Sequence, residues 1–211
     1  MEFNIITLPV GQMQSNCYLL IAENRDCLIV DPGDDGDYLE RIIADHRAKP
    51  LTILATHGHF DHIMAVTELK LAYNIPFLIN QKDEFLVKNM RQSAGHFLGI
   101  QTDPPPDADN FLQENEIIAL GGHKIRVIGT PGHTPGSVCL YLEKEKCLIS
   151  GDTLFAGGGV GRTDFSYSSP TDLAKSLEII FALPADTEIK PGHGEASTLK
   201  KEKKRHDFFL T

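Results

Sequence analysis

The amino-acid sequence predicts an α/β protein in which two β-sheets pack together and helices lie outside them. Two observations support this prediction. Short apolar runs bounded by Gly, Pro, Asn and Asp indicate strands, and segments with apolar residues at helical spacing follow them. This order of strands and then helices occurs in the first half of the chain and again in the second half. We therefore expect two sheets rather than one.

The first half of the chain begins with extended apolar runs and then alternates helical and extended patterns. The expected strands cover residues 3–8, 17–22, 27–30, 51–56 and 75–79. The expected helices cover residues 38–46, 63–71 and 82–90. Residues 95–109, which include three successive prolines, are expected to form a loop.

The second half repeats the pattern, with an expected helix over residues 173–183. Its expected strands cover residues 116–120, 124–129, 137–142, 147–150 and 188–190. The basic run at 200–205 is interrupted by Glu202 and is interpreted as the solvated face of a terminal helix. Because no Pro/Gly/Ser-rich or charged linker divides the 211 residues, we expect residues 1–211 to form a single domain.

Composition and charge exclude several classes of protein. The content of 41% hydrophobic and 23% charged residues excludes disordered and fibrous classes. A formal net charge of −9 argues against binding nucleic acid, because neutralising phosphates requires clustered Lys and Arg. The N-terminal residues lack the pattern of a signal peptide, and no apolar run is long enough to span a membrane. We expect a cytoplasmic protein without a membrane partner, and the sequence carries no signal for an oligomeric state.

The four cysteines are interpreted as small buried hydrophobes. Each lies within or beside an apolar run, and none forms a C-x-x-C pair. A reducing compartment also disfavours disulfides. These residues are Cys17, Cys27, Cys139 and Cys147.

The most specific chemical signal is an H-x-H-x-D-H run that follows the strand expected at 51–56. It contains His57, His59, Asp61 and His62. Burying three imidazoles and a carboxylate within six residues is costly without a partner, and a divalent cation satisfies all of them. Nitrogen and carboxylate ligands at roughly 2.0–2.2 Å suit Zn²⁺ or Fe²⁺ better than Ca²⁺ or Mg²⁺.

Three further candidate ligands follow expected strands downstream. Each of His133, Asp152 and His193 stands directly after a glycine, which permits a close approach of the backbone. Four ligands from one short loop cannot all close on a single tetrahedral ion with good geometry. We therefore expect these three side chains to converge on the same rim as the run at 57–62. The other histidines, interpreted as surface or loop residues without ligand spacing, are His46, His96, His123 and His206.

These motifs, in this order and over nearly the whole chain, resemble those of the metallo-β-lactamase superfamily. The most similar members are the type II glyoxalases, or hydroxyacylglutathione hydrolases, in their short single-domain form. Besides the candidate ligands, the resemblance rests on the runs 31–33, 130–136 and 150–155. It implies the α/β fold of that family, a metallo-β-lactamase-like αβ/βα four-layer sandwich of two mixed β-sheets flanked by helices.

The resemblance also implies two bound divalent metal ions, with Zn²⁺ as the first choice and Fe or Mn as alternatives. The implied ligands of one ion are His57, His59 and His133, those of the other are Asp61, His62 and His193, and Asp152 bridges the two. Asp31, in an Asp-Pro-Gly turn, either supports these ligands from behind or serves only as a turn residue.

The activity implied is hydrolysis of an acylated small-molecule thiol, such as S-lactoylglutathione, to a carboxylic acid and a free thiol. Hydroxide formed at the two ions would attack the carbonyl carbon, since one zinc ion alone can lower the pKa of water to about 7. Asp61 is assigned the additional catalytic role of orienting this hydroxide. Arg162 matches the position of a basic residue that contacts the glutathione part of the substrate in the family, so we assign Arg162 to substrate binding.

Some features separate this chain from its relatives. Asp152 stands where true β-lactamases of the superfamily carry a cysteine, which argues against antibiotic hydrolysis. The run around Arg162 also resembles the persulfide dioxygenases, which hold one iron on the equivalents of His57, His133 and Asp152. A mononuclear iron persulfide dioxygenase is therefore the alternative function, and a non-catalytic metal-binding module is a third, weaker one.

Overall fold

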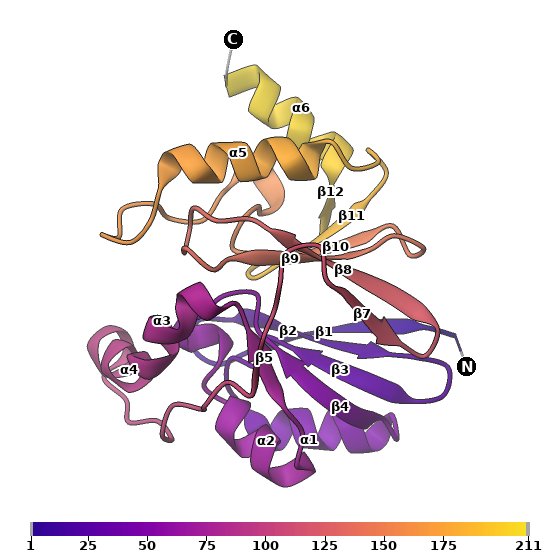
Figure 1. The fold of residues 1–211 in the computed structure, drawn as a ribbon, viewed down its shortest axis with the longest axis vertical. Coiled ribbons are helices and arrows are strands. Elements are labelled where there is room, and N and C mark those ends of the chain that lie inside the picture. The colour runs from indigo at the N-terminus through magenta and orange to yellow at the C-terminus, as the bar shows by residue number, and fades with distance from the viewer. Residues whose placement is uncertain (1, 210–211) are drawn as a thin grey trace.

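Two six-stranded sheets pack face to face, and helices cover the outer face of each (Figure 1). The computed structural model describes residues 2–209. Each sheet contains both parallel and antiparallel pairs of strands. The expected fold class, an αβ/βα four-layer sandwich of two mixed sheets, is therefore confirmed.

The first sheet takes its strands in chain order from one edge to the other. The first three strands pair antiparallel, and the third to the sixth pair parallel. In the second strand, Tyr18 and Leu20 face the other sheet while Cys17 and Leu19 pack toward the outer helices. This strand is buried on both faces because it lies inside the sandwich. The strands are β1 (Asn4–Val10), β2 (Ser15–Ile21), β3 (Asp26–Val30), β4 (Lys49–Leu54), β5 (Phe77–Ile79) and β6 (Asn110–Phe111).

The second sheet is formed by the later part of the chain and again takes its strands in order. They are β7 (Ile117–Leu120), β8 (His123–Gly129), β9 (Val138–Leu142), β10 (Cys147–Gly151), β11 (Glu188–Pro191) and β12 (Ser197–Thr198). Only β10 and β11 pair parallel among these described strands. The carboxyl ends of β10 and β11 therefore lie side by side, at the same end of the sheet.

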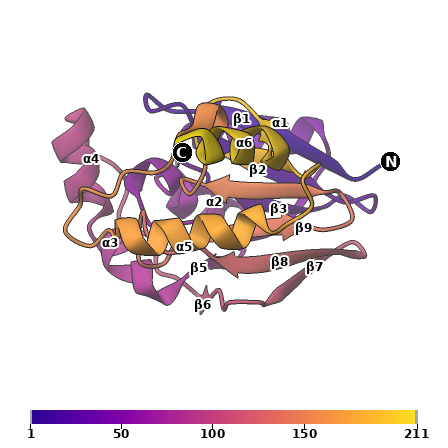
Figure 2. The ribbon, with the colours of Figure 1, turned by 90° about the horizontal axis from the view of Figure 1, so that it is seen from above.

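The helices form the outer layers. In Figure 1, α1 and α2 lie below the first sheet, α3 and α4 lie at one end, and α5 and α6 lie above the second sheet. The view from above in Figure 2 shows α5 and α6 lying over the strands of that sheet and running in roughly the same direction. The helices are α1 (Gly36–Asp45), α2 (Val66–Tyr73), α3 (Glu84–Lys88), α4 (Met90–Leu98), α5 (Pro170–Phe181) and α6 (Leu199–Phe209). Three short 3₁₀ helices span Phe60–His62, Gln81–Asp83 and Ala156–Gly158.

The apolar core consists of three clusters, one in each space between the four layers of secondary structure. One cluster lies between the first sheet and its helices, and includes Leu39 of α1 and Leu69 of α2. A second cluster lies between the two sheets, and a third joins β9 to Ile180 of α5. Each fully buried leucine such as Leu39 stabilises the fold by ~1.5–3 kcal/mol. Burial of these side chains holds the two sheets and their loops in fixed positions.

The structure differs from the sequence prediction over residues 82–98, where the single helix expected at 82–90 is divided into a 3₁₀ helix, α3 and the start of α4. The prediction of a loop over residues 95–109 was wrong at its start, because α4 continues through Gly95 to Leu98. Met90 and Ala94 give this helix a buried face, which outweighs the unfavourable glycine. The helix ends where Gly99 adopts φ 69°, a left-handed conformation that favours glycine. The two-residue strands β6 and β12 were also not predicted.

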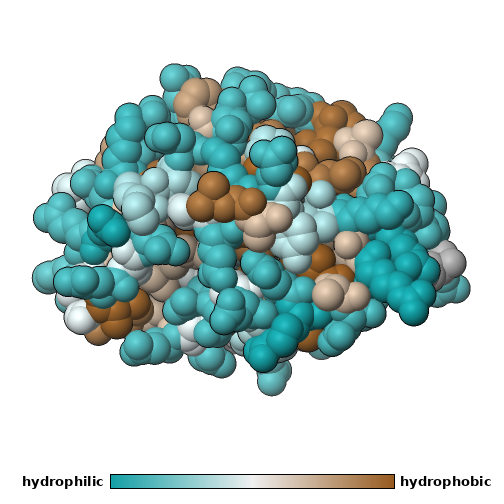
Figure 3. Space-filling model, turned by 90° about the horizontal axis from the view of Figure 1, so that it is seen from below, coloured by the Kyte–Doolittle hydropathy of each residue, from teal (hydrophilic) through white to brown (hydrophobic). Residues whose placement is uncertain are grey.

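The side of the molecule seen from below carries no large apolar patch (Figure 3). Figure 3 shows this face covered mainly by hydrophilic side chains, with small separate apolar patches between them. Isolated exposed apolar residues of this kind are ordinary on a protein surface. Within residues 2–209, no helix has both the length and the apolar character needed to cross a membrane.

Candidate metal centre

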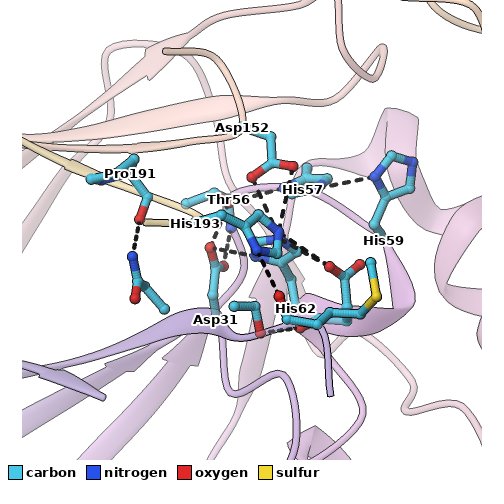
Figure 4. Close-up of polar contacts among 12 residues, drawn as sticks. Asp31, Thr56, His57, His59, His62, Asp152, Pro191 and His193 are labelled. Atoms are coloured by element: carbon cyan, nitrogen blue, oxygen red, sulfur yellow. Dashed lines mark hydrogen bonds and ion pairs between the residues drawn. The ribbon is translucent and has the colours of Figure 1, made fainter. Parts of the chain in front are cut away.

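The side chains predicted as metal ligands meet at one edge of the sandwich, where loops of both sheets approach each other (Figure 4). Four come from the segment that follows β4, which includes the 3₁₀ helix Phe60–His62. The others follow β8, β10 and β11. The structure thus brings together His57, His59, Asp61, His62, His133, Asp152 and His193.

Three histidines form a first ligand group. Nδ1 of His59 lies 2.9 Å from Nε2 of His133 and 3.2 Å from Nε2 of His57. Two nitrogen ligands of one tetrahedral ion, each about 2.05 Å from it, stand about 3.3 Å apart. The three ring nitrogens therefore fit a single Zn²⁺ or Fe²⁺ ion. His57 and His133 are buried, and His59 is half-buried.

A carboxylate and two histidines form a second ligand group. Nε2 of His193 lies 3.2 Å from Oδ2 of Asp61 and 3.3 Å from Nε2 of His62. The third separation, between Nε2 of His62 and Oδ2 of Asp61, is 3.7 Å. These atoms also have the spacing of ligands that share one ion.

Asp152 lies between the two groups. Its Oδ2 is 3.6 Å from Nε2 of His133 and 3.8 Å from Nε2 of His193, and its Oδ1 is 3.5 Å from Nε2 of His62. Oδ1 is buried and has no hydrogen-bond partner. An unpaired buried carboxylate oxygen is costly, and a metal ion would satisfy it. The residues present therefore fit a pair of divalent ions.

Glycine is required beside this carboxylate. A Cβ atom at position 192 would lie 2.1 Å from Oδ1 of Asp152 and 2.9 Å from Cε1 of His62. A residue larger than glycine at position 192 would push these side chains apart. The expectation that a glycine precedes the ligand to allow close approach is confirmed at this position.

The two groups differ in charge. Burial lowers the pKa of His57 well below its usual value and lowers the pKa of His59 to about 3. Burial also acts against the charged form of His62, but the carboxylates around it, Asp61 first, raise its pKa to about 10. The pKa of His193 is raised in the same way, against burial, by its hydrogen bond to Asp61. His57 and His59 of the first group thus present neutral imidazoles, whereas His62 of the second group holds a proton that a metal ion would replace.

Asp31 supports the second group from behind. It is fully buried, accepts hydrogen bonds from the backbone N–H (2.7 Å) and Oγ1 (2.6 Å) of Thr56, and lies 3.2 Å from Nδ1 of His62. Contact with Nδ1 leaves Nε2 of His62 directed at Asp61 and Asp152. Of the two interpretations of Asp31, the supporting role therefore fits the structure.

Asp83 holds the loops that carry the first group, and it was not predicted from the sequence. It accepts hydrogen bonds from the backbone N–H of Gly58 (2.9 Å), from Oγ1 of Thr134 (2.6 Å) and from the backbone N–H of Gly136 (2.6 Å). These contacts tie the loop of His59 to the loop that follows β8. No local motif marks Asp83, because its partners are distant in the sequence.

Tyr167 and the backbone at Arg162 orient two ligands of the first group. The hydroxyl of Tyr167 lies 2.9 Å from Nε2 of His59, and the carbonyl oxygen of Arg162 lies 2.9 Å from Nδ1 of His133. Each of these contacts uses the ring nitrogen that points away from the first ligand group, so the other ring nitrogen faces that group. Such contacts fix the tautomer and the orientation of a metal-binding histidine. Tyr167 was not predicted from the sequence, because it lies 108 positions from His59.

The side chain of Arg162 lines the cavity beside the ligands. Its guanidinium group forms two hydrogen bonds to Asp164, at 2.8 and 2.9 Å, and lies 4.6 Å from the ring centroid of Phe165. From the sequence, Arg162 was expected to bind substrate. Its position at the cavity is compatible with that role, but its charge is already paired.

One histidine was misinterpreted. His123 is only 4% exposed, and its two ring nitrogens contact Glu145 and Glu23. It also stacks on Phe3, with ring centroids 4.2 Å apart. The interpretation of His123 as an ordinary surface or loop histidine was wrong, because it lies in strand β8 and is buried between two glutamates.

The cysteines lie where the sequence predicted them. All four are free and buried in the apolar clusters. Burial raises the pKa of Cys27 and of Cys147 to about 12. These thiols are therefore poor nucleophiles and poor metal ligands at neutral pH.

The sequence has close counterparts among known proteins. The probable metallo-hydrolase YqgX of Bacillus subtilis is 36% identical over 203 residues, which cover 95% of each chain. The hydroxyacylglutathione hydrolase GloC of Haemophilus influenzae is 34% identical over 213 residues, which cover 97% of each chain.

Solved structures of similar chains superpose over nearly the full length. The BLEG-1 B3 metallo-beta-lactamase has a TM-score of 0.89 at 33% identity, and the match covers 99% of this chain and 100% of that one. TTHA1623, solved in a di-iron-bound form, has a TM-score of 0.86 at 33% identity, and the match covers 94% of this chain and 96% of that one. Residues 10–193 match the family model described as the metallo-beta-lactamase superfamily. The chain belongs to this superfamily, and its two His/Asp groups stand at the strand ends that both sheets contribute.

Proposed function

We propose that the protein is a metal-dependent hydrolase that cleaves thioesters such as S-lactoylglutathione into a carboxylic acid and a free thiol. The observation that carries this proposal is the position of Asp152, whose two oxygens face the two ligand groups beside an open cavity. The similarity to GloC, which is named a hydroxyacylglutathione hydrolase, supports the choice of substrate.

The proposed ligands are the two groups described above, with Asp152 shared between them. Two divalent ions held there would make hydroxide available at neutral pH and polarise a carbonyl group. Asp61 lines the cavity, and we propose that its carboxylate orients the attacking oxygen. Asp31 and Tyr167 keep ligand rings in place through the nitrogens that face away from the ions. Zn²⁺ is the first choice of metal, with Fe or Mn as alternatives, and the di-iron form of TTHA1623 makes iron a serious candidate.

The environment that we propose is the cytoplasm. Four free buried thiols are typical of a reducing compartment. A net charge of −9 disfavours nucleic acid as a partner, so we propose a small-molecule substrate.

The test is thiol release from S-lactoylglutathione by protein stripped with a chelator and then reloaded with Zn²⁺, Fe²⁺ or Mn²⁺. We expect no activity in the stripped protein and recovery with at least one of the metals. Absence of thiol release with all three metals would contradict thioester hydrolysis.

A β-lactamase activity is a second candidate because of BLEG-1. The sequence argued against antibiotic hydrolysis, because Asp152 stands in place of the cysteine that true β-lactamases of the superfamily carry. The 33% identity to a chain described as a B3 metallo-beta-lactamase weakens that argument. The same reloaded protein should therefore be assayed with a chromogenic cephalosporin, and we expect slower turnover than on the thioester.

A mononuclear iron persulfide dioxygenase is the remaining alternative. It would need only His57, His133 and Asp152. We favour the hydrolase because Asp61, His62 and His193 form a second complete group. Oxygen consumption with glutathione persulfide, together with no thioester hydrolysis under anaerobic conditions, would reverse this choice.

A further inference from the structure

A cavity of about 370 Å³ opens beside the two ligand groups. Away from the ligands, its walls are formed largely by aromatic and other apolar side chains. Its volume is at the lower end of the range for small-molecule sites, roughly 300–1,000 Å³. The apolar residues that line it are Met13, Phe60, Phe97, Phe155, Val160 and Phe165.

One part of the wall is a pair of stacked rings from the segment after β4 and from α4. Phe60 and Phe97 lie with ring centroids 5.8 Å apart and an interplanar angle of 8°. Phe60 is buried, whereas Phe97 is 51% exposed. A phenylalanine that is half exposed at the edge of a cavity leaves apolar surface in water, and a flat apolar ligand would cover it.

A second pair of rings lies next to the first ligand group. Phe165 and Tyr167 stack with centroids 5.2 Å apart and an interplanar angle of 11°. Phe165 lies 5.4 Å from the ring of His59 and 6.5 Å from that of His133. Apolar surface therefore reaches up to the metal ligands, where the scissile carbonyl of a thioester would have to lie.

Charged groups in the cavity do not match a strongly charged substrate. Among the described residues that line it, Arg162 is the one with a permanent positive charge. Its guanidinium group already has a carboxylate partner, Asp164, and its side chain is 60% exposed. Glutathione carries a carboxylate at each end, so it would find one cation, already paired, and would compete with Asp164 for it.

We propose that this cavity selects thioesters whose acyl group carries a flat apolar ring close to the scissile carbonyl. This inference rests on the proposed thioester hydrolysis and adds the class of acyl group that the site prefers. The ring would lie against Phe97 and Phe165, and the thiol part would leave the cavity past Arg162. S-Lactoylglutathione would then be a substrate with few of the favourable apolar contacts.

The experiment compares two thioesters of the same uncharged thiol, acetyl- and phenylacetyl-N-acetylcysteamine, on the metal-reloaded protein. A single methylene group in an apolar pocket changes kcat/KM by about tenfold or more. We therefore expect kcat/KM for the phenylacetyl thioester to exceed that for the acetyl thioester at least about tenfold, mainly through a lower KM. Ratios within about twofold would overturn the inference.

Variants show whether the two aromatic positions cause this preference. In Phe97→Ala and in Phe165→Ala, we expect the ratio of the two kcat/KM values to fall to about threefold or less. Leu71→Ala is the matched control, because Leu71 is an apolar residue of α2 that is 77% exposed and does not line the cavity. It should keep the full ratio. A wild-type ratio retained in both phenylalanine variants would also overturn the inference.

A binding measurement separates this inference from the proposed function. Calorimetric titration of the reloaded protein with acetate and with phenylacetate compares ligands that have the same carboxylate and differ in the ring. We expect the Kd of phenylacetate to be at least about tenfold lower. If no thioester is cleaved, the proposed function fails, and equal Kd values would then overturn this inference as well. This inference alone would be overturned if S-lactoylglutathione is cleaved, the acetyl and phenylacetyl thioesters have equal kcat/KM values, and acetate and phenylacetate have equal Kd values.

Discussion

The two ligand groups share a bridge but are built on different electrostatic principles. The first consists of three imidazoles whose outer nitrogens contact uncharged partners such as the hydroxyl of Tyr167. The second contains the carboxylate of Asp61 and is backed by the carboxylate of Asp31. Burial therefore lowers the pKa of His57 and His59 in the first group, while neighbouring carboxylates raise the pKa of His62 and His193 in the second.

This difference has a consequence for metal binding. In the first group, the lone pairs of His57 and His59 are already free at neutral pH, because burial lowers their pKa. In the second, His62 carries a proton, because carboxylates raise its pKa to about 10. An ion entering the second group must displace protons, but it gains the attraction of more negative charge.

The largest expected effect comes from removing the residue that both groups share. In Asp152→Ala, we expect the affinity for both ions to fall by more than about 100-fold, since loss of a supporting contact alone costs about 10- to 100-fold. The measurement is metal content per chain after dialysis. Asp186→Ala, an exposed carboxylate paired with Lys146, is the control. A variant that keeps both ions tightly would contradict the bridging role.

The next effect is confined to one group. In His193→Ala, we expect the second ion to be lost, the first to remain, and thioester hydrolysis to collapse. Metal content and anaerobic thiol release test this expectation. His46→Ala, at an exposed histidine that follows α1, should behave as wild type. Full hydrolysis in His193→Ala would show that the second group is not needed for the reaction.

A smaller effect is expected at the edge of the first group. Tyr167→Phe removes only the hydroxyl that lies 2.9 Å from Nε2 of His59. We expect about a tenfold loss of affinity for the first ion, with the second ion unchanged. Competition with a chromogenic chelator measures both affinities. Tyr38→Phe on α1 is the control, and equal affinities in the two variants would exclude a positioning role for Tyr167.

The smallest expected effect is a difference in the number of protons that each ligand group releases when it binds a metal ion. Because the pKa values of His62 and His193 are raised, binding at the second group should release protons near neutral pH, and its affinity should fall as the pH is lowered. His57 and His59, whose pKa values are lowered, should release none. Calorimetry in buffers of different ionisation enthalpy gives the protons released per ion. Equal release by both ions would remove the distinction between the groups.

Much of this arrangement could be predicted from the sequence because the signals are local. Apolar runs and helical spacing predicted the α/β fold, and all four cysteines lie in the predicted core. The run at 57–62 stands out because three imidazoles and a carboxylate so close together need a common partner. The glycines before His133, Asp152 and His193 marked the remaining candidates because glycine permits a close approach of the backbone.

Tertiary structure alone decided which residues support and surround the ligands. Tyr167 meets His59 across 108 positions of the chain, and Asp83 meets Thr134 across 51. His123 became a buried, paired residue for the same reason, and α4 extended past Gly95 because its apolar face found a place in the core. Such contacts depend on how the two sheets pack, so no pattern near these residues indicates them. The sequence determines the chemistry of the ligands, and the packing of distant segments determines their orientation, their charge and the apolar walls beside them.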